Sequence, residues 1–105
     1  PMLGLLSAAA TAGRTDFYLV GGFDHDDTFI KELQKGKGNT VLYSFAAQDC
    51  FETGSKAFEL AVEAAKGNLP AEKNVLVPGE LVTVETLDDY LETYNFYQEQ
   101  ILAYQ

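Results

Sequence analysis

The sequence predicts an α/β fold in which an open parallel sheet is built from right-handed βαβ units. Three observations support this prediction. Two nearly unbroken apolar runs, at 16–23 and 40–47, have the pattern of buried strands. Helical periodicity precedes, separates and follows these runs, and glycines mark the predicted helix ends. A length of 105 residues corresponds to one domain, so we expect a single domain over 1–105.

The elements of the first half follow from spacing and punctuation. Apolar residues recur at helical spacing from Leu3 to Ala10 and Gly13 follows, which predicts a short first helix. Residues 16–23 then form a strand that we expect to be covered on both faces. Asp26 or Asp27 is suited to cap a second helix, which ends before the next glycines. Its predicted inner side consists of Phe29, Ile30 and Leu33.

The second half begins with the strand at 40–47. Asp49 and Glu52 form a variant capping box that opens a long helix ending at Gly67. Two extended segments, 74–77 and 81–84, flank a Pro-Gly turn, and Thr86 is suited to cap a last helix. The long helix has one predicted inner face, made of Phe51, Gly54, Phe58, Ala61, Val62 and Ala65. The last helix carries Leu87, Leu91, Tyr94 and Ile101 at roughly helical spacing. The resulting sheet is narrow, so at least one edge needs cover from another chain or a second copy.

Charge and composition exclude several function classes. The chain has 7 Lys and Arg against 16 Asp and Glu, for a net charge of −9. Nucleic acids and anionic membranes need clustered basic residues, which argues against both partners. A single cysteine and a single histidine provide neither an internal disulfide nor a Cys/His metal cage. We therefore expect no metal and no cofactor.

Candidate ligand-binding residues follow the two buried strands. Asp24 ends the first strand and Gln48 the second, where parallel α/β sheets bind ligands beyond the carboxyl ends of their strands. A carboxylate accepts hydrogen bonds from two hydroxyls and an amide both donates and accepts, so the pair suits a neutral polyhydroxyl ligand. Phe23 offers a ring face for a sugar. From spacing alone, however, a backbone-satisfying role for the two polar residues and a core role for Phe23 are favoured.

The order of these segments resembles the C-terminal portion of the type I periplasmic sugar-binding proteins of ABC transporters. The resemblance rests on VGGFDHDDTFIKELQKG, NTVLYSFAAQD, ETGSKAFELAVEAAKGN and PGELVTVETLDDYLE, with MLGLLSAAATAGRTD resembling the preceding small-residue helix. It covers nearly the whole chain. It implies a flavodoxin-like lobe, present as a partial domain, in a protein whose two lobes close around a mono- or oligosaccharide.

The resemblance also implies residue roles and partners. Asp24 matches an aspartate that binds sugar hydroxyls, Phe23 a ring beside it, Gln48 an amide near the interlobe hinge, and Asp26 a helix cap. Gly21-Gly22 is a departure, because one glycine is usual there. The implied partners are a sugar, the missing N-terminal lobe and a membrane permease. The implied location is the periplasm, or outside the cell with a lipid anchor. With half a cleft, we expect weak or undetectable sugar binding by this chain alone, and self-association through exposed strand edges.

Other features of the sequence bear on alternative functions. Asp24 to Asp27 could be a metal or acid/base site, but four adjacent residues cannot all point inward, which favours a solvated loop and cap. Cys50 lacks a partner imidazole in its motif and is interpreted as structural, so we expect no enzymatic activity. A lactose-repressor-like effector domain and the sensor domain of a chemoreceptor or kinase share the implied fold. The repressor alternative would need a basic helix-turn-helix before the domain, and the 40–50 segment departs from its usual pattern.

Overall fold

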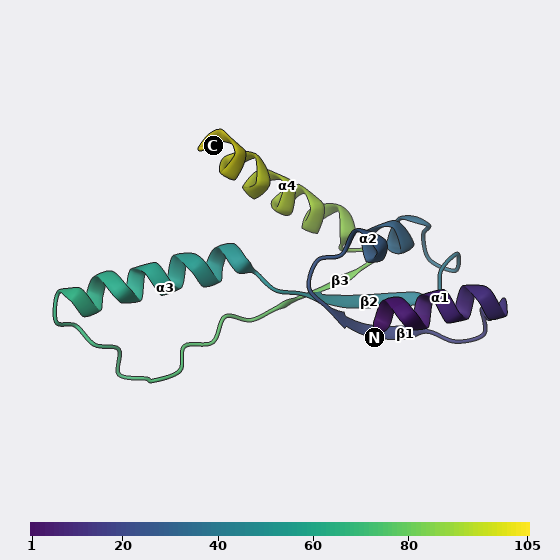
Figure 1. Ribbon diagram of the computed structural model, residues 1–105, viewed down its shortest axis with the longest axis horizontal. Coiled ribbons are helices and arrows are strands. Elements are labelled where there is room, and N and C mark those ends of the chain that lie inside the picture. Colours follow the sequence, from purple (N-terminus) through teal and green to yellow (C-terminus); the bar gives the residue numbers. More distant parts are fainter.

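The computed structural model describes residues 1–105 as a three-stranded sheet with four helices (Figure 1). The elements are α1 Met2–Ala12, β1 Leu19–Phe23, α2 Asp27–Gln34, β2 Leu42–Ala47, α3 Cys50–Ala65, β3 Glu80–Thr83 and α4 Leu87–Ala103. The predicted α/β class and all four helices are confirmed. No helix has the length and apolar content needed to cross a bilayer.

The sheet is mixed, which corrects the expectation of a wholly parallel one. Its order is β1-β2-β3, where β1 and β2 are parallel but β3 runs antiparallel to β2. The cause is visible in Figure 1, because α3 does not cross back over the sheet after β2. The chain returns through 66–79 and enters β3 from the end at which β2 stops. The sequence predicts an extended segment at 74–77, but these residues belong to the irregular return and form no strand.

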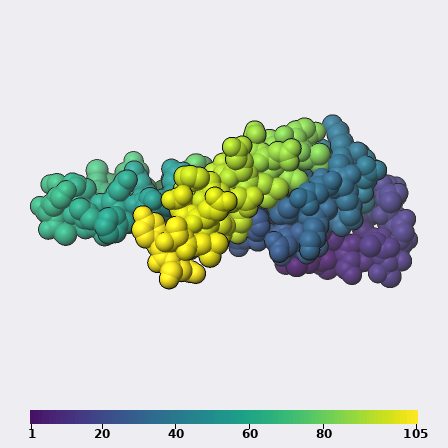
Figure 2. Space-filling view, turned by 90° about the horizontal axis from the view of Figure 1, so that it is seen from above, coloured from purple at the N-terminus to yellow at the C-terminus, as the bar shows by residue number.

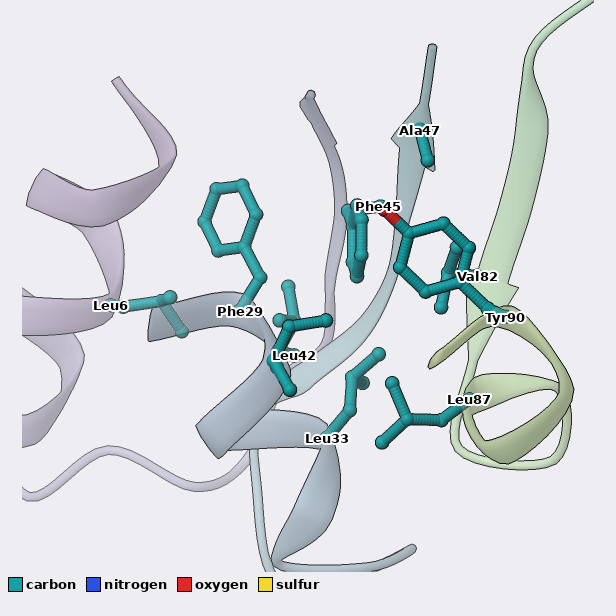
Figure 3. Close-up of a cluster of buried hydrophobic side chains, with 10 residues drawn as sticks. Leu6, Phe29, Leu33, Leu42, Phe45, Ala47, Val82, Leu87 and Tyr90 are labelled. Carbon is teal, nitrogen blue, oxygen red and sulfur yellow. The ribbon is translucent and has the colours of Figure 1, made fainter. Parts of the chain in front are cut away.

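A hydrophobic core lies between one face of the sheet and helices α2 and α4, with α1 contributing beside β1 (Figure 3). Phe45 and Leu33 are fully buried, and the Phe45 ring lies 5.5 Å from Phe29 and 5.9 Å from Tyr90, measured between centroids. The predicted inner side of α2 is buried as expected. We call the packed body formed by α1, α2, α4 and the sheet the head.

The opposite face of the sheet is open, contrary to the expectation that the strands are covered on both faces. Val20 on β1 is 69% exposed, Tyr43 on β2 48% and Leu81 on β3 59%. Helices α2 and α4 both lie above the sheet in Figure 1. The apolar runs that resembled doubly covered strands therefore leave part of their hydrophobic surface in water.

Helix α3 and the return segment 66–79 project from the head, and we call them the arm (Figures 1 and 2). The predicted inner face of α3 packs against no sheet, the helix buries no residue, and Phe58 is 71% exposed. As a result, the radius of gyration is 17.8 Å, against about 13 Å for a compact chain of this size. The accessible surface of 7751 Å² likewise exceeds the roughly 5,800 Å² of a compact protein of this mass.

Local sequence explains where most helices begin and end. The Asp26 carboxylate accepts from the Thr28 amide at 2.7 Å, and Asp49 caps α3 by accepting from the Glu52 amide, also at 2.7 Å. Gly13 ends α1 in the left-handed conformation. Thr86 precedes α4 but makes no side-chain cap, because its hydroxyl accepts from the Thr83 amide of β3 instead.

Candidate functional site

A cleft of about 380 Å³ opens at the carboxyl ends of β1 and β2. It is bounded by the loop after β1, the β2–α3 junction, the start of β3 and one side of α4. Asp24 and Gln48 both line this cleft, as the positions of their strands predict. Phe23 does not line it and is 60% exposed outside it, because the ring belongs to the last residue of β1 rather than to the loop.

Asp24 is held in place by its backbone. It is the one non-glycine residue with positive φ, at 75°, a conformation that aspartate tolerates better than most residues. Its amide donates to the Ala46 carbonyl of β2 at 2.9 Å, which ties the loop to the neighbouring strand. Just before it, Gly22 has φ 90°, and a Cβ there would lie 3.0 Å from the Phe29 ring. This approach to α2 requires glycine at the second position of the Gly21-Gly22 pair.

Gln48 lies between the last residue of β2 and the Asp49 cap of α3. Its side chain is exposed and lines the cleft, and it carries both a hydrogen-bond donor and an acceptor. Cys50, the first residue of α3, also lines the cleft and is exposed. No group of three or more His, Cys, Asp and Glu side chains is arranged to hold a metal ion.

Aromatic rings form one wall of the cleft. Tyr90, Tyr94 and Tyr97 recur on one side of α4, and Phe51 from α3 stacks on Tyr97 with 4.3 Å between ring centroids and 15° between ring planes. This stack is the contact that attaches the first turn of α3 to α4. The rings offer flat apolar surfaces for the C–H faces of a polyol or sugar.

His25 lines the cleft, whereas the sequence predicts a solvated loop and helix cap at 24–27. Its ring stacks on Tyr94 at 3.9 Å and 9°, and its Nδ1 lies 2.8 Å from the Tyr90 hydroxyl oxygen. Its Nε2 is 3.6 Å from a carboxylate oxygen of Asp27. The signal that could have found it is the Tyr90, Tyr94 and Tyr97 stripe, since a helix with three tyrosines on one side needs polar partners for its hydroxyls.

The cleft is negative and holds no cationic side chain of lysine or arginine. Asp24, Asp49 and Glu80 contribute three carboxylates. Burial raises the pKa of Tyr90 to about 12, with the nearby Tyr94 and acidic groups adding to the effect. Tyr90 therefore keeps its proton at neutral pH, and the site presents neutral hydroxyls and an amide beside carboxylate acceptors.

Comparison with solved structures identifies a related fold. A solute-binding protein of an ABC transporter from Agrobacterium vitis, solved with bound allitol, matches at a TM-score of 0.68 and 26% sequence identity. The match covers 89% of this chain and 31% of that protein. The chain resembles an ABC transporter solute-binding protein. No protein-family model matches it, and no curated protein matches its sequence.

This resemblance agrees with the family that the motifs resemble, and it supports the predicted α/β fold class. The chain spans about a third of the length of that protein, so its elements correspond to a portion of a solute-binding-protein fold. The matched protein is a solute-binding protein, and the allitol bound to it is a polyol.

Proposed function

We propose that the chain is the C-terminal portion of the substrate-binding component of a sugar ABC transporter, and that its cleft binds a neutral sugar or polyol through hydrogen bonds. The observation that carries this proposal is the convergence of Asp24 and Gln48 on one cleft. The two residues follow different strands and lie 24 positions apart in the chain. Phe23 was part of the sequence-based site and is left out of the proposed contacts, because it lies outside the cleft.

The charge of the cleft favours a neutral ligand over an anionic one. Asp24, Asp49 and Glu80 line it, and neither lysine nor arginine does. A phosphate or carboxylate ligand would meet repulsion without a compensating cation. A polyol instead donates its hydroxyl protons to these carboxylates, and Gln48 can serve ligand groups of either kind.

The cleft is open, and a second lobe is proposed to close it. In two-lobed binding proteins, closure excludes water, so that hydroxyl hydrogen bonds form without competition. The chain corresponds to 31% of the matched protein, which agrees with one wall of such a site. We therefore expect millimolar or weaker binding of a monosaccharide or polyol by this chain, about −4 kcal/mol or less favourable.

The test is an NMR titration of the ¹⁵N-labelled chain with allitol at high millimolar concentration. We expect amide shifts confined to cleft residues around Asp24 and Gln48. Shifts scattered over the head, or no shifts at saturating solubility, would contradict the proposed function. Micromolar affinity by calorimetry would contradict the idea that this chain supplies only one wall.

A pair of aspartate variants provides the matched control. Asp24→Asn removes a cleft carboxylate, and we expect it to weaken the allitol shifts. Asp88→Asn removes a carboxylate from the first turn of α4, outside the cleft lining, and should leave them unchanged. Equal effects of the two variants would show that the response reflects net charge rather than a specific site.

The partners and location follow from the same proposal. A transporter component of this kind delivers its ligand to a membrane permease and works in the periplasm, or outside the cell when anchored by lipid. The family resemblance supports these two statements. The reading frame around this segment tests them, since an upstream export signal or lipid-attachment site is expected and a DNA-binding helix-turn-helix would contradict transport.

We also propose that the chain self-associates when it is alone. β1 and β3 are the outer strands of the sheet, and Val20 and Leu81 expose apolar side chains on its open face. Unpaired strand edges beside apolar surface are templates for association. Sedimentation should show a weight-average mass that rises with concentration, and a monomer at all concentrations would refute the hypothesis.

A further inference from the structure

His25 is fixed by groups from two helices. Tyr94 of α4 stacks on its ring, Tyr90 of α4 meets Nδ1 at 2.8 Å, and Asp27 of α2 faces Nε2 at 3.6 Å. Asp24 precedes it in the chain and also lines the cleft. These are the titratable groups around the imidazole, and each ring nitrogen has its own neighbour. The orientation of the ring is therefore set before any ligand arrives.

The neighbours select one tautomer of the neutral imidazole. If Nδ1 carried the proton, Nε2 would present a lone pair to the Asp27 carboxylate, so that two acceptors would face each other. If Nε2 carries the proton, its N–H dipole points toward that carboxylate, and Nδ1 accepts the Tyr90 hydroxyl proton at 2.8 Å. The second arrangement satisfies both contacts, and the elevated pKa of Tyr90 means that its hydroxyl has the proton to give.

We propose that His25 is a specificity-determining residue of the cleft, which holds the Tyr90 oxygen as a hydrogen-bond acceptor toward the ligand. This inference rests on the proposed function. Because the single hydroxyl proton of Tyr90 is engaged by Nδ1, the tyrosine oxygen has only lone pairs left to offer. Tyr90 is largely buried but lines the cleft, and its hydroxyl lies on the side of the ring that faces Phe45 of β2 (Figure 3).

The consequence is a preference for one ligand chemistry at this position. A ligand hydroxyl can donate to the Tyr90 oxygen, whereas an ether or carbonyl oxygen would place an acceptor against an acceptor. Asp24 and Glu80 are also pure acceptors when ionised. With His25 in place, the aromatic wall therefore selects for hydroxyl donors as the carboxylates do. The cleft should then prefer polyols with free hydroxyls over their O-alkylated or oxidised forms.

The first test needs no ligand. Long-range ¹H–¹⁵N NMR of the histidine-labelled chain, at a pH high enough to keep the imidazole neutral, should show the proton on Nε2. Nδ1 should resonate as a hydrogen-bonded acceptor. A dominant Nδ1–H form would overturn the proposal, because Tyr90 would then be free to donate to the ligand.

Two tyrosine variants separate the hydrogen bond from the ring stack. Tyr90→Phe should shift the Nδ1 resonance toward that of a free ring nitrogen. Tyr94→Phe keeps the stacked ring and should leave Nδ1 unchanged. If Tyr90→Phe leaves the Nδ1 resonance of His25 unchanged, the hydrogen bond between Nδ1 and the Tyr90 hydroxyl is disproved. Asp27→Asn, on an exposed side chain, should weaken the tautomer preference, while Asp88→Asn at the start of α4 should not.

The second test measures specificity with allitol and its mono-O-methyl ethers as probes. In the unmodified chain, the ether blocked at the position facing Tyr90 should bind about 2- to 10-fold more weakly than allitol. His25→Phe retains a ring against Tyr94 and frees the Tyr90 proton, so this ratio should fall toward one. Asp27→Asn should also lower this affinity ratio, and it leaves the His25 ring in place.

The two tests distinguish their failures. If allitol does not bind while the Nε2–H tautomer and the Tyr90→Phe shift are found, the proposed function fails and the His25–Tyr90 arrangement stands. If allitol binds but the ether ratio is the same in His25→Phe and Asp27→Asn as in the unmodified chain, the specificity role is refuted and the proposed function stands.

Discussion

The head and the arm have similar sequence patterns but different environments. α2 and α3 both carry an aspartate cap and an apolar face at helical spacing. α2 buries Phe29, Ile30 and Leu33 against the sheet, whereas α3 buries none of its residues. The comparison shows that an amphipathic pattern establishes the helix but not the partner for its apolar face.

The largest difference is expected in the response to losing a phenylalanine ring. Phe45→Ala removes a fully buried ring from the head and should cost about 3–5 kcal/mol of unfolding free energy. Phe58→Ala removes a ring that is 71% exposed on the arm, and should change the unfolding free energy by less than about 0.5 kcal/mol. Urea unfolding followed by circular dichroism measures both. Comparable losses would mean that the arm packs against the head in solution.

Two glycine variants should act in opposite directions. Gly22→Ala in the head places a side chain at φ 90° and 3.0 Å from the Phe29 ring, which should destabilise by about 1–3 kcal/mol. Gly54→Ala in the middle of α3 meets nothing within 4 Å, and should favour the helix by about 0.5–1 kcal/mol.

The measurement distinguishes helicity from global stability. Gly54→Ala should raise the ellipticity at low temperature without moving the urea midpoint of the head, since a single unpacked helix is marginal in water. Gly22→Ala should lower that midpoint. A midpoint that rises with Gly54→Ala would show that arm and head unfold as one unit.

The smallest expected effect is a pH dependence localised to the head. Burial pushes the pKa of Glu32 up, but hydrogen bonds from Lys35 and Thr40 outweigh it and leave the pKa below its ordinary value. A carboxyl with a lowered folded-state pKa stabilises above its unfolded pKa, and this contribution is lost as pH falls through the folded one. We expect at most about 1 kcal/mol from this source.

Glutamine substitutions test whether Glu32 is the source of this pH dependence. Glu32→Gln should remove part of the acid-side loss of stability, measured by urea unfolding between neutral and acidic pH. On the arm, the pKa of Glu63 is lowered by hydrogen bonds from Lys66 and Asn68, but its side chain contacts nothing in the head. Glu63→Gln should therefore leave the pH profile of head unfolding unchanged. A change there equal to that of Glu32→Gln would contradict the assignment.

Local signals in the sequence predicted much of the fold. Caps at Asp26 and Asp49, the glycine after α1 and the periodic inner side of α2 all act within a few residues, and the structure confirms each of them. The direction of β3 and the open face of the sheet could not be predicted this way. Both depend on whether α3 packs back over the sheet, which is a long-range event without a local sequence signal.

The candidate site likewise contains residues that the sequence predicts and residues that it does not. Asp24 and Gln48 could be placed because each ends a strand of a parallel pair, and strand ends converge on one edge. His25 could not be placed from its own motif, because its hydrogen-bond partner Tyr90 is 65 residues away in sequence. The sequence predicts a sugar-facing ring at Phe23, but this residue is the last one of β1 and its ring lies outside the cleft.

Two chain segments join the arm to the head, and they lie side by side. Ala47 pairs with Glu80 in the sheet, just where β2 leaves for α3 and the return segment arrives. These two adjacent segments, together with the stack of Phe51 on Tyr97, set the angle between the arm and the head. Gln48 lies at this junction and lines the cleft, so a change in the angle between arm and head would widen or narrow the opening through which a solute enters.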